Sequence, residues 1–265
     1  MEQSEQTSGP QSDHLPGGSG GVWRVRDGSG ETRVHRPTGP WTPAVHELLR
    51  FLGERGLDGI PAVYGVDEEQ REVLSYLPGE TLDPENDQPS DDALAAAAGW
   101  LRRFHDAVAD FAPTSDVWRQ GEQPLDRARG EIICHNDPGL YNWVVVEGEF
   151  AGMIDWDRAG PGLPIDDLAF LVWSGVPLLR EVPATEAARR IRLAAAAYGG
   201  VSGSELLDAV THRMGLIAAR WRAGIERGDP GTLALRDAGI MARHEARVAA
   251  FAGRRESIRA LTATP

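Results

Sequence analysis

Extended and helical patterns occupy separate parts of this 265-residue chain, and this separation constrains its fold more than any other feature. Up to about residue 80, short apolar runs alternate with turn residues, and one helix is expected over 44–55. After Ser90 the sequence becomes alanine-rich, with helical spacing of its apolar residues. Helices are expected there over about 90–110, 166–175, 185–198, 204–227 and 232–252. This segregation predicts an α+β fold of two lobes, a small antiparallel sheet with one helix followed by a mainly helical part.

The break between the predicted lobes falls at Pro78-Gly79. We assign residues 15–79 to the N-terminal lobe and residues 80–265 to the C-terminal lobe. Residues 1–14 carry few large apolar groups and no periodicity, which is typical of a disordered tail.

Two pairs of extended runs are expected to build the N-terminal sheet. Residues 22–25 pair with 32–36 in the first hairpin, and residues 62–66 pair with 72–77 in the second. Thr42 suits the N-cap of the intervening helix, which would place the following proline at its first position.

Composition excludes several classes of function. All 27 basic residues are arginine, so chemistry that needs a lysine is excluded, including P-loop and Schiff-base chemistry. The formal net charge of −13 repels nucleic acid and no dense basic block offsets it, so no nucleic-acid partner is expected. This acidity is compatible with a cationic substrate, and it is equally ordinary for a soluble protein.

Patterns for membrane insertion and secretion are absent from the sequence. No apolar run approaches the roughly 20 residues that span a bilayer, so no membrane partner is expected. The polar, acidic N-terminus lacks the pattern of a signal peptide, and the single cysteine, Cys134, fits a reducing compartment. We therefore expect a cytoplasmic protein. No pattern specifies its oligomeric state.

A hairpin in the middle of the chain brings oxygen-bearing side chains together. Its predicted strands, 143–146 and 150–154, flank a three-residue connection. Pairing of the strands places Asn142 within one residue of the position opposite Asp155. Oxygen ligands of this kind suit Mg²⁺, which keeps phosphate and water as its remaining ligands. Asp137 lies in the loop that enters the hairpin and adds a second carboxylate.

The pattern His135-x-Asp137-x-x-x-x-Asn142, followed by Ile154-Asp155, resembles the catalytic loop and metal-binding aspartate of the aminoglycoside phosphotransferase family, whose members are relatives of protein kinases. The resemblance implies a protein-kinase-like bilobal fold. It also implies that Asp137 is the catalytic base and that Asn142 and Asp155 bind Mg²⁺.

Two further acidic residues fit the same resemblance. Asp167 matches the family's structural aspartate, which braces the catalytic loop through backbone hydrogen bonds. Asp157 would support the metal ligands from behind.

In the N-terminal lobe, the resemblance implies a glycine loop over the phosphates, a strand cation that contacts them and a helix glutamate that pairs with that cation. Gly18 and Gly20 lie at the position of the loop, although a glycine run near a terminus equally fits a linker. With no lysine available, Arg36 is the predicted cation, with His35 as its rival because a one-residue register error exchanges them. Glu47 is the predicted ion-pair partner.

The segment after the second hairpin would be the hinge that binds the adenine. Ser75 and Leu77 would offer backbone groups to the base by the same resemblance. The phosphate donor implied is ATP or GTP.

The function implied is transfer of the γ-phosphate to a hydroxyl of a small molecule, such as an aminoglycoside or another antibiotic. Family members also phosphorylate choline and sugars, so the acceptor stays open. Two alternatives remain: a nucleotide-binding kinase-like protein with weak or no catalysis, because of the lysine-free strand, and a phosphatase using Asp155 and Asp157. The second is disfavoured because such sites usually recruit a lysine.

Overall fold

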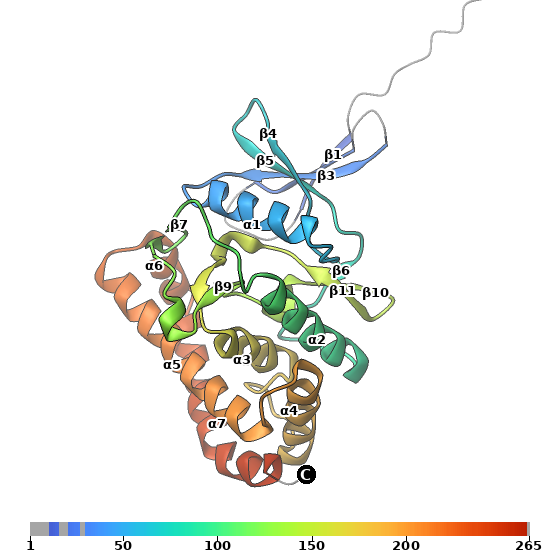
Figure 1. Ribbon diagram of the computed structural model, residues 1–265. Coiled ribbons are helices and arrows are strands. Elements are labelled where there is room, and N and C mark those ends of the chain that lie inside the picture. The colour runs from blue at the N-terminus through green and yellow to red at the C-terminus, as the bar shows by residue number, and fades with distance from the viewer. Residues whose placement is uncertain (1–10, 16–20, 27–29, 264–265) are drawn as a thin grey trace, which may run out of the picture.

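The computed structural model describes residues 11–15, 21–26 and 30–263, and it shows a sheet at one end of the molecule and a helical body at the other (Figure 1). The antiparallel N-terminal sheet has the strand order β1-β2-β3-β5-β4. Its strands are β1 (Gln11–His14), β2 (Trp23–Arg26), β3 (Thr32–Pro37), β4 (Val63–Val66) and β5 (Arg71–Ser75). Both predicted hairpins are present.

Part of the predicted disordered tail, residues 11–14, is a strand in the structure. These residues form β1 and pair with β2. A polar strand of this kind carries no apolar alternation from which it could be predicted. The rest of that segment lies outside the described residues, as do Gly18 and Gly20 of the predicted phosphate loop.

Helix α1 (Thr42–Glu54) confirms the helix predicted in the N-terminal lobe. Its apolar stripe is buried at Val45, Leu48, Leu49 and Leu52, at the spacing of one helical face. The helix begins one residue earlier than predicted. Trp41 occupies the cap position, and Thr42 instead accepts a hydrogen bond from the Gly39 backbone N–H through its hydroxyl (2.9 Å).

The C-terminal lobe is built around the central hairpin and is mainly helical (Figure 1). Its helices are α2 (Asp91–Ala107), α3 (Pro164–Gly175), α4 (Ala184–Tyr198), α5 (Gly203–Glu226), α6 (Pro230–Asp237) and α7 (Ile240–Thr262). Its strands are β6 (Glu80–Thr81), β7 (Val117–Trp118), β8 (Gly121–Glu122), β9 (Ile132–Cys134), β10 (Trp143–Val146), β11 (Glu149–Met153) and β12 (Gly160–Gly162), with short 3₁₀ turns at 127–129, 140–142 and 156–158. The predicted α+β, bilobal fold class is confirmed.

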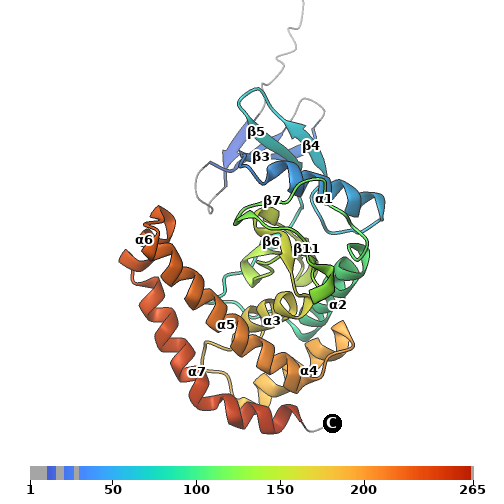
Figure 2. The ribbon, with the colours of Figure 1, turned by 60° about the vertical axis from the view of Figure 1, so that its left-hand side comes forward.

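The helix predicted over 232–252 is in fact two helices. The chain turns at Gly239, which adopts a left-handed conformation (φ 70°) between α6 and α7. Glycine adopts this conformation without the steric cost that other residues carry. Helix α7 then continues to Thr262 beside α5, and α6 lies at the far tip of this pair (Figure 2).

The central hairpin has a tighter connection than predicted. Val146 faces Glu149, and Val145 faces Phe150 after a register shift between Val144 and Val145. The connecting residues, Glu147 and Gly148, both have positive φ (53° and 84°), as in a two-residue hairpin turn. The bulge compensates for the shorter turn, so the two ends of the hairpin still meet at 142 and 154.

The segment before β4 in the N-terminal lobe lies directly against the C-terminal lobe at two backbone carbonyl groups, those of Asp58 and Gly59. The Met153 N–H donates to the carbonyl of Gly59 (2.8 Å), and the Trp100 indole N–H donates to the carbonyl of Asp58 (2.8 Å). A Cβ on Gly152 would lie 2.4 Å from the Gly59 oxygen, closer than real contacts allow. Glycine at 152 is therefore what lets the segment before β4 lie directly on β11.

In the described part of the chain, no helix is both long enough and apolar enough to cross a membrane.

We expect Gly152→Ala to lower the free energy of unfolding by roughly 1–3 kcal/mol, the usual cost of forcing extra volume into a packed site. Chemical denaturation measures this change. Gly215→Ala is the matched control, because Gly215 lies inside α5 with no atom near the added methyl group. That variant should be stabilised by about 0.5–1 kcal/mol. Equal effects of the two substitutions would contradict the close approach described here.

Candidate functional site

The catalytic loop predicted from sequence is held in place by Asp167, on α3. Its carboxylate accepts hydrogen bonds from the backbone N–H groups of His135 and Asn136 (2.7 Å each) and lies 3.2 Å from His105 Nε2. Burial opposes ionisation of this side chain, but the hydrogen bond with His105 and the nearby charges of His105, His135 and Arg213 outweigh it and hold the pKa of Asp167 below its ordinary value. Asp167 therefore positions the loop, in the role that the resemblance implied.

A buried group of His105, Cys134 and Asp167 has the composition of a metal site, with its ligand atoms within 4.8 Å of one another. The atoms that could bind a metal already have partners within the protein. Asp167 accepts hydrogen bonds from the loop, and His105 Nδ1 lies 2.8 Å from the Tyr198 hydroxyl. Burial also raises the pKa of the Cys134 thiol well above its ordinary value. The group is a structural brace.

Asp137 lies at the far end of this loop with its carboxylate largely covered; the side chain is 13% exposed. The Tyr141 hydroxyl donates to Oδ1 (2.6 Å), and Arg158 Nε lies 3.6 Å from Oδ2. Burial raises the pKa of Asp137, and the contacts with Tyr141 and Arg158 oppose that rise. Such a carboxylate can accept a hydrogen bond from a hydroxyl that approaches it.

Asn142 and Asp155 stand at the open end of the hairpin, as predicted. The Ile154 N–H donates to the Asn142 carbonyl (2.9 Å), which places Asp155 next to Asn142. The Asn142 side-chain amide donates to the Asp137 carbonyl oxygen (2.8 Å), and its own Oδ1 forms no hydrogen bond with any described residue. Asp155 is in a left-handed conformation (φ 60°), an uncommon backbone state that is found at functional sites. An amide oxygen beside a carboxylate fits the oxygen ligands of Mg²⁺.

Arg36 crosses from β3 to the hairpin and meets three carboxylates. Its Nε lies 2.8 Å from Glu72, its Nη1 lies 3.1 Å from Asp155, and its Nη2 contacts Asp157. His35 lies on the other face of the strand, where it pairs with Asp67 (2.8 Å). Of the two residues that the sequence left open, Arg36 is therefore the one that faces Asn142 and Asp155 across the lobes.

Sequence reasoning missed Glu72 and His46, which connect Arg36 to α1. Glu72 lies directly opposite Arg36 in the pairing of β3 with β5, and its second oxygen lies 2.8 Å from His46 Nε2. Glu72 is only 3% exposed, so this ion pair is shielded from solvent. The signal that could have found it is the cross-strand pairing of two opposite charges.

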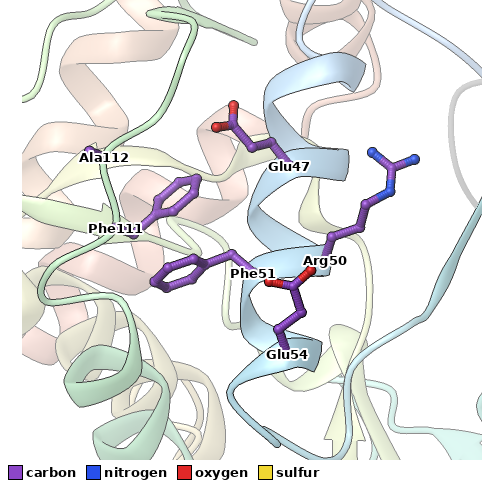
Figure 3. Close-up of a pocket in the computed structure, with 6 residues that line it drawn as sticks. All are labelled: Glu47, Arg50, Phe51, Glu54, Phe111 and Ala112. Atoms are coloured by element: carbon purple, nitrogen blue, oxygen red, sulfur yellow. The ribbon is translucent and has the colours of Figure 1, made fainter.

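The prediction that Glu47 pairs with Arg36 is wrong. Its carboxylate accepts hydrogen bonds from the backbone N–H and the hydroxyl of Thr114 (2.7 Å for the hydroxyl). Figure 3 shows Glu47 and Phe51 pointing from α1 toward Phe111, where they line a shallow hollow of about 310 Å³. On α1 the neighbouring residue, His46, faces the sheet instead, because successive helix positions differ in direction by about 100°.

The predicted hinge residues lie where β5 ends. Ser75 is tied to Ala62, since its N–H donates to the Ala62 carbonyl and its hydroxyl accepts from the Ala62 N–H (2.8 Å each). The backbone of Leu77 has no hydrogen bond with any described residue. Its role toward an adenine stays a prediction.

Comparison with known proteins bears on the same region. Residues 109–204 match the model of a family described as "Phosphotransferase enzyme family", a stretch that contains Asp137, Asn142, Asp155 and Asp167. The family resemblance predicted from these residues is confirmed. The Trifolitoxin immunity protein of Rhizobium leguminosarum bv. trifolii is 38% identical over 151 residues, which span 55% of this chain and 56% of that protein. The chain thus matches little more than half the length of this relative.

Solved structures of low identity share the whole fold. The amicoumacin kinase hAmiN, solved in complex with AMP-PNP, Ca²⁺ and Ami, aligns with a TM-score of 0.62 over 90% of this chain and 87% of that chain, at 14% identity. A choline/ethanolamine kinase family protein from Mesorhizobium loti aligns with a TM-score of 0.59 over 96% and 94%, at 18% identity. At these identities the likeness establishes the kinase-like fold.

We expect Glu72→Gln to lower the free energy of unfolding by roughly 3 kcal/mol, because breaking a buried ion pair leaves Arg36 and His46 without their shared partner. Glu69→Gln is the matched control: Glu69 is 67% exposed and touches Arg71 only at the surface. Its loss should cost less than about 1 kcal/mol. Urea denaturation compares the two, and equal stabilities of Glu72→Gln and wild type would contradict the buried network.

Proposed function

We propose that this chain transfers the γ-phosphate of ATP or GTP to a hydroxyl group of a small molecule. The observation that carries the proposal is the convergence of Asp137, Asn142 and Asp155, from one loop and the two ends of one hairpin, beneath an arginine from the other lobe. Phosphoryl transfer requires positioning and charge stabilisation more than covalent chemistry, and this set of groups supplies both.

Each residue then has a distinct task. Asp137 accepts a hydrogen bond from the acceptor hydroxyl and thereby orients the hydroxyl oxygen toward the γ-phosphorus. Tyr141 and Asn142 hold the Asp137 carboxylate in place. Asn142 and Asp155 would hold Mg²⁺, which when bound neutralises charge on the triphosphate. Arg36 has the fork geometry for phosphate oxygens and stands in the position assigned to the strand cation.

The cofactors and setting proposed are those of such a reaction. We assign Mg²⁺ and the phosphates of ATP or GTP to the open end of the hairpin, beside Asn142 and Asp155, with Leu77 at the adenine. The protein would act in the cytoplasm, where these nucleotides are supplied. The names of the immunity protein and the amicoumacin kinase make antibiotics the first acceptors to screen, with choline and ethanolamine after them.

A nucleotide-binding protein without activity is the main alternative. This alternative rests on the absence of a lysine from the strand. The contacts of Arg36 argue against it, because a permanently charged side chain takes the position of that lysine. A phosphatase that uses Asp155 as its nucleophile is less favoured, since Arg36 engages both Asp155 and Asp157. Trapping an aspartyl-phosphate on Asp155 would revive it.

We expect Asp137→Ala to reduce phosphate transfer by roughly 10²–10⁴-fold, the usual contribution of a positioned base, while MgATP affinity changes little. Asp155→Ala should weaken MgATP binding at least roughly tenfold as well, because it removes a metal ligand. Calorimetry with MgATP and a coupled assay of ATP consumption over an acceptor panel give the two readouts.

The control for both variants is Glu149→Ala, an exposed acid on the same hairpin, which should leave binding and transfer unchanged. Full activity of Asp137→Ala would refute its assigned role. Binding of MgATP by the wild type without transfer to any acceptor would favour the inactive alternative.

A further inference from the structure

One face of α5 is turned toward the catalytic loop. Arg213 is buried, and its Nη2 donates to the carbonyl of Asn136 (2.5 Å), the residue before Asp137; its guanidinium also lies 5.2 Å from the centre of the Phe170 ring. Arg220 follows seven residues later, so two helical turns bring it back to the same face. The contact made by Arg213 therefore places Arg220 on the side of α5 that looks toward the catalytic loop.

Arg220 is an exposed arginine of α5 that lies close enough to Arg213 and Arg158 to be repelled by their charges. It forms no hydrogen bond or ion pair with the residues that the structure describes, although its side chain is reached by solvent. The surrounding protein and the neighbouring guanidinium groups of Arg213 and Arg158 lower the pKa of Arg220 to about 10. Arg158 is itself 3.6 Å from Asp137, which ties this cluster of cations to the catalytic carboxylate.

Carboxylates near Arg220 do not neutralise it. Asp166 and Asp137 both attract the guanidinium, yet no N···O contact within 4.0 Å joins either of them to it. Arg158 thus lies beside Asp137, Arg213 binds the residue before it, and Arg220 feels the charge of both cations without an ion pair of its own among the described residues. Mutual repulsion of this kind is relieved when an anion binds, and a guanidinium fork matches the paired oxygens of a carboxylate or phosphate.

We propose that Arg220, assisted by Arg158, binds an anionic group of the acceptor whose hydroxyl Asp137 orients. This inference rests on the proposed function and narrows it: the acceptor is a hydroxylated compound with a carboxylate or phosphate, and not a purely cationic one. The net charge of −13, by contrast, is compatible with a cationic substrate. Local charge beside the reacting group decides recognition, since interactions between exposed charges are screened within about 10 Å.

The test compares acceptors that differ in one charged group. Glucuronate, glucose and glucosamine share ring hydroxyls and carry an anionic, a neutral and a cationic group, and 3-hydroxypropanoate and 3-amino-1-propanol form a smaller pair. Phosphate transfer from MgATP is measured for each, together with calorimetric binding to the protein saturated with MgAMP-PNP. We expect the wild type to prefer the acidic members in both measurements.

The variant Arg220→Gln should lower kcat/KM, or the affinity, for acidic acceptors by about 10- to 100-fold, as expected for loss of a hydrogen bond to a charged group. Its KM for MgATP should stay unchanged. The matched control is Arg222→Gln, which removes the same charge from an exposed position two residues along α5 and should alter neither quantity.

Several results would overturn the inference. For the wild type, these are a preference for neutral or cationic acceptors, or failure to bind any acidic acceptor. For Arg220→Gln, they are behaviour equal to that of the wild type, or a loss of affinity for MgATP as large as the loss of affinity for acidic acceptors. The last would assign Arg220 to the nucleotide. Failure of the proposed function looks different, because the wild type would then neither bind MgAMP-PNP nor transfer phosphate to any acceptor.

Discussion

The guanidinium of Arg36 is the interaction on which the arrangement of the site depends. It holds carboxylates from both lobes, Glu72 beside it in the sheet and Asp155 and Asp157 in the segment that follows the hairpin. Without a cation between them these acids would repel one another across a poorly solvated space, where Coulomb forces are stronger than in water. Burial raises the pKa of Asp157, and the charge of Arg36 opposes that rise.

A second buried acid performs a different task on the other side of the site. Asp167 accepts backbone hydrogen bonds from the catalytic loop and contacts only groups that position it. Arg36 joins the two lobes through its side chain, which reaches Asp155 and Asp157, whereas Asp167 joins α3 to a neighbouring loop. Asp137, the predicted catalytic residue, thus follows a loop segment that backbone hydrogen bonds fix, whereas the groups opposite it are held through side chains.

The sequence was sufficient to predict what depends on local pattern. The apolar stripe of α1, the two hairpins of the sheet and the spacing of Asp137, Asn142 and Asp155 all follow from residues close together in the chain. What failed depends on distant residues. Glu47 and His46 are adjacent on one helix, and the position of the sheet decides which of them meets Glu72, the partner of Arg36. Arg220 carries no motif, and only the contact of Arg213 with the catalytic loop shows where it faces.

Boundaries failed for smaller physical reasons. The local sequence around Gly239 fits a helix interior, and only the packing of α7 beside α5 requires the chain to turn there. The register of the central hairpin was displaced because a two-residue turn and a bulge together replace a three-residue connection. The two changes cancel at the open end, which explains why the site residues were found although the pairing was off by one.

The backbone contact between Gly59 and β11 has a mechanical consequence. No side chain lies between the two backbone segments there, so no side-chain rotation can change the distance between them. The hydrogen bond from Met153 to Gly59 fixes that distance. The bridge made by Arg36, in contrast, spans the gap with a flexible chain of methylene groups. Any opening of the lobes would therefore turn the sheet about the contact at Gly59, while the arginine side chain adjusts to the changed distance.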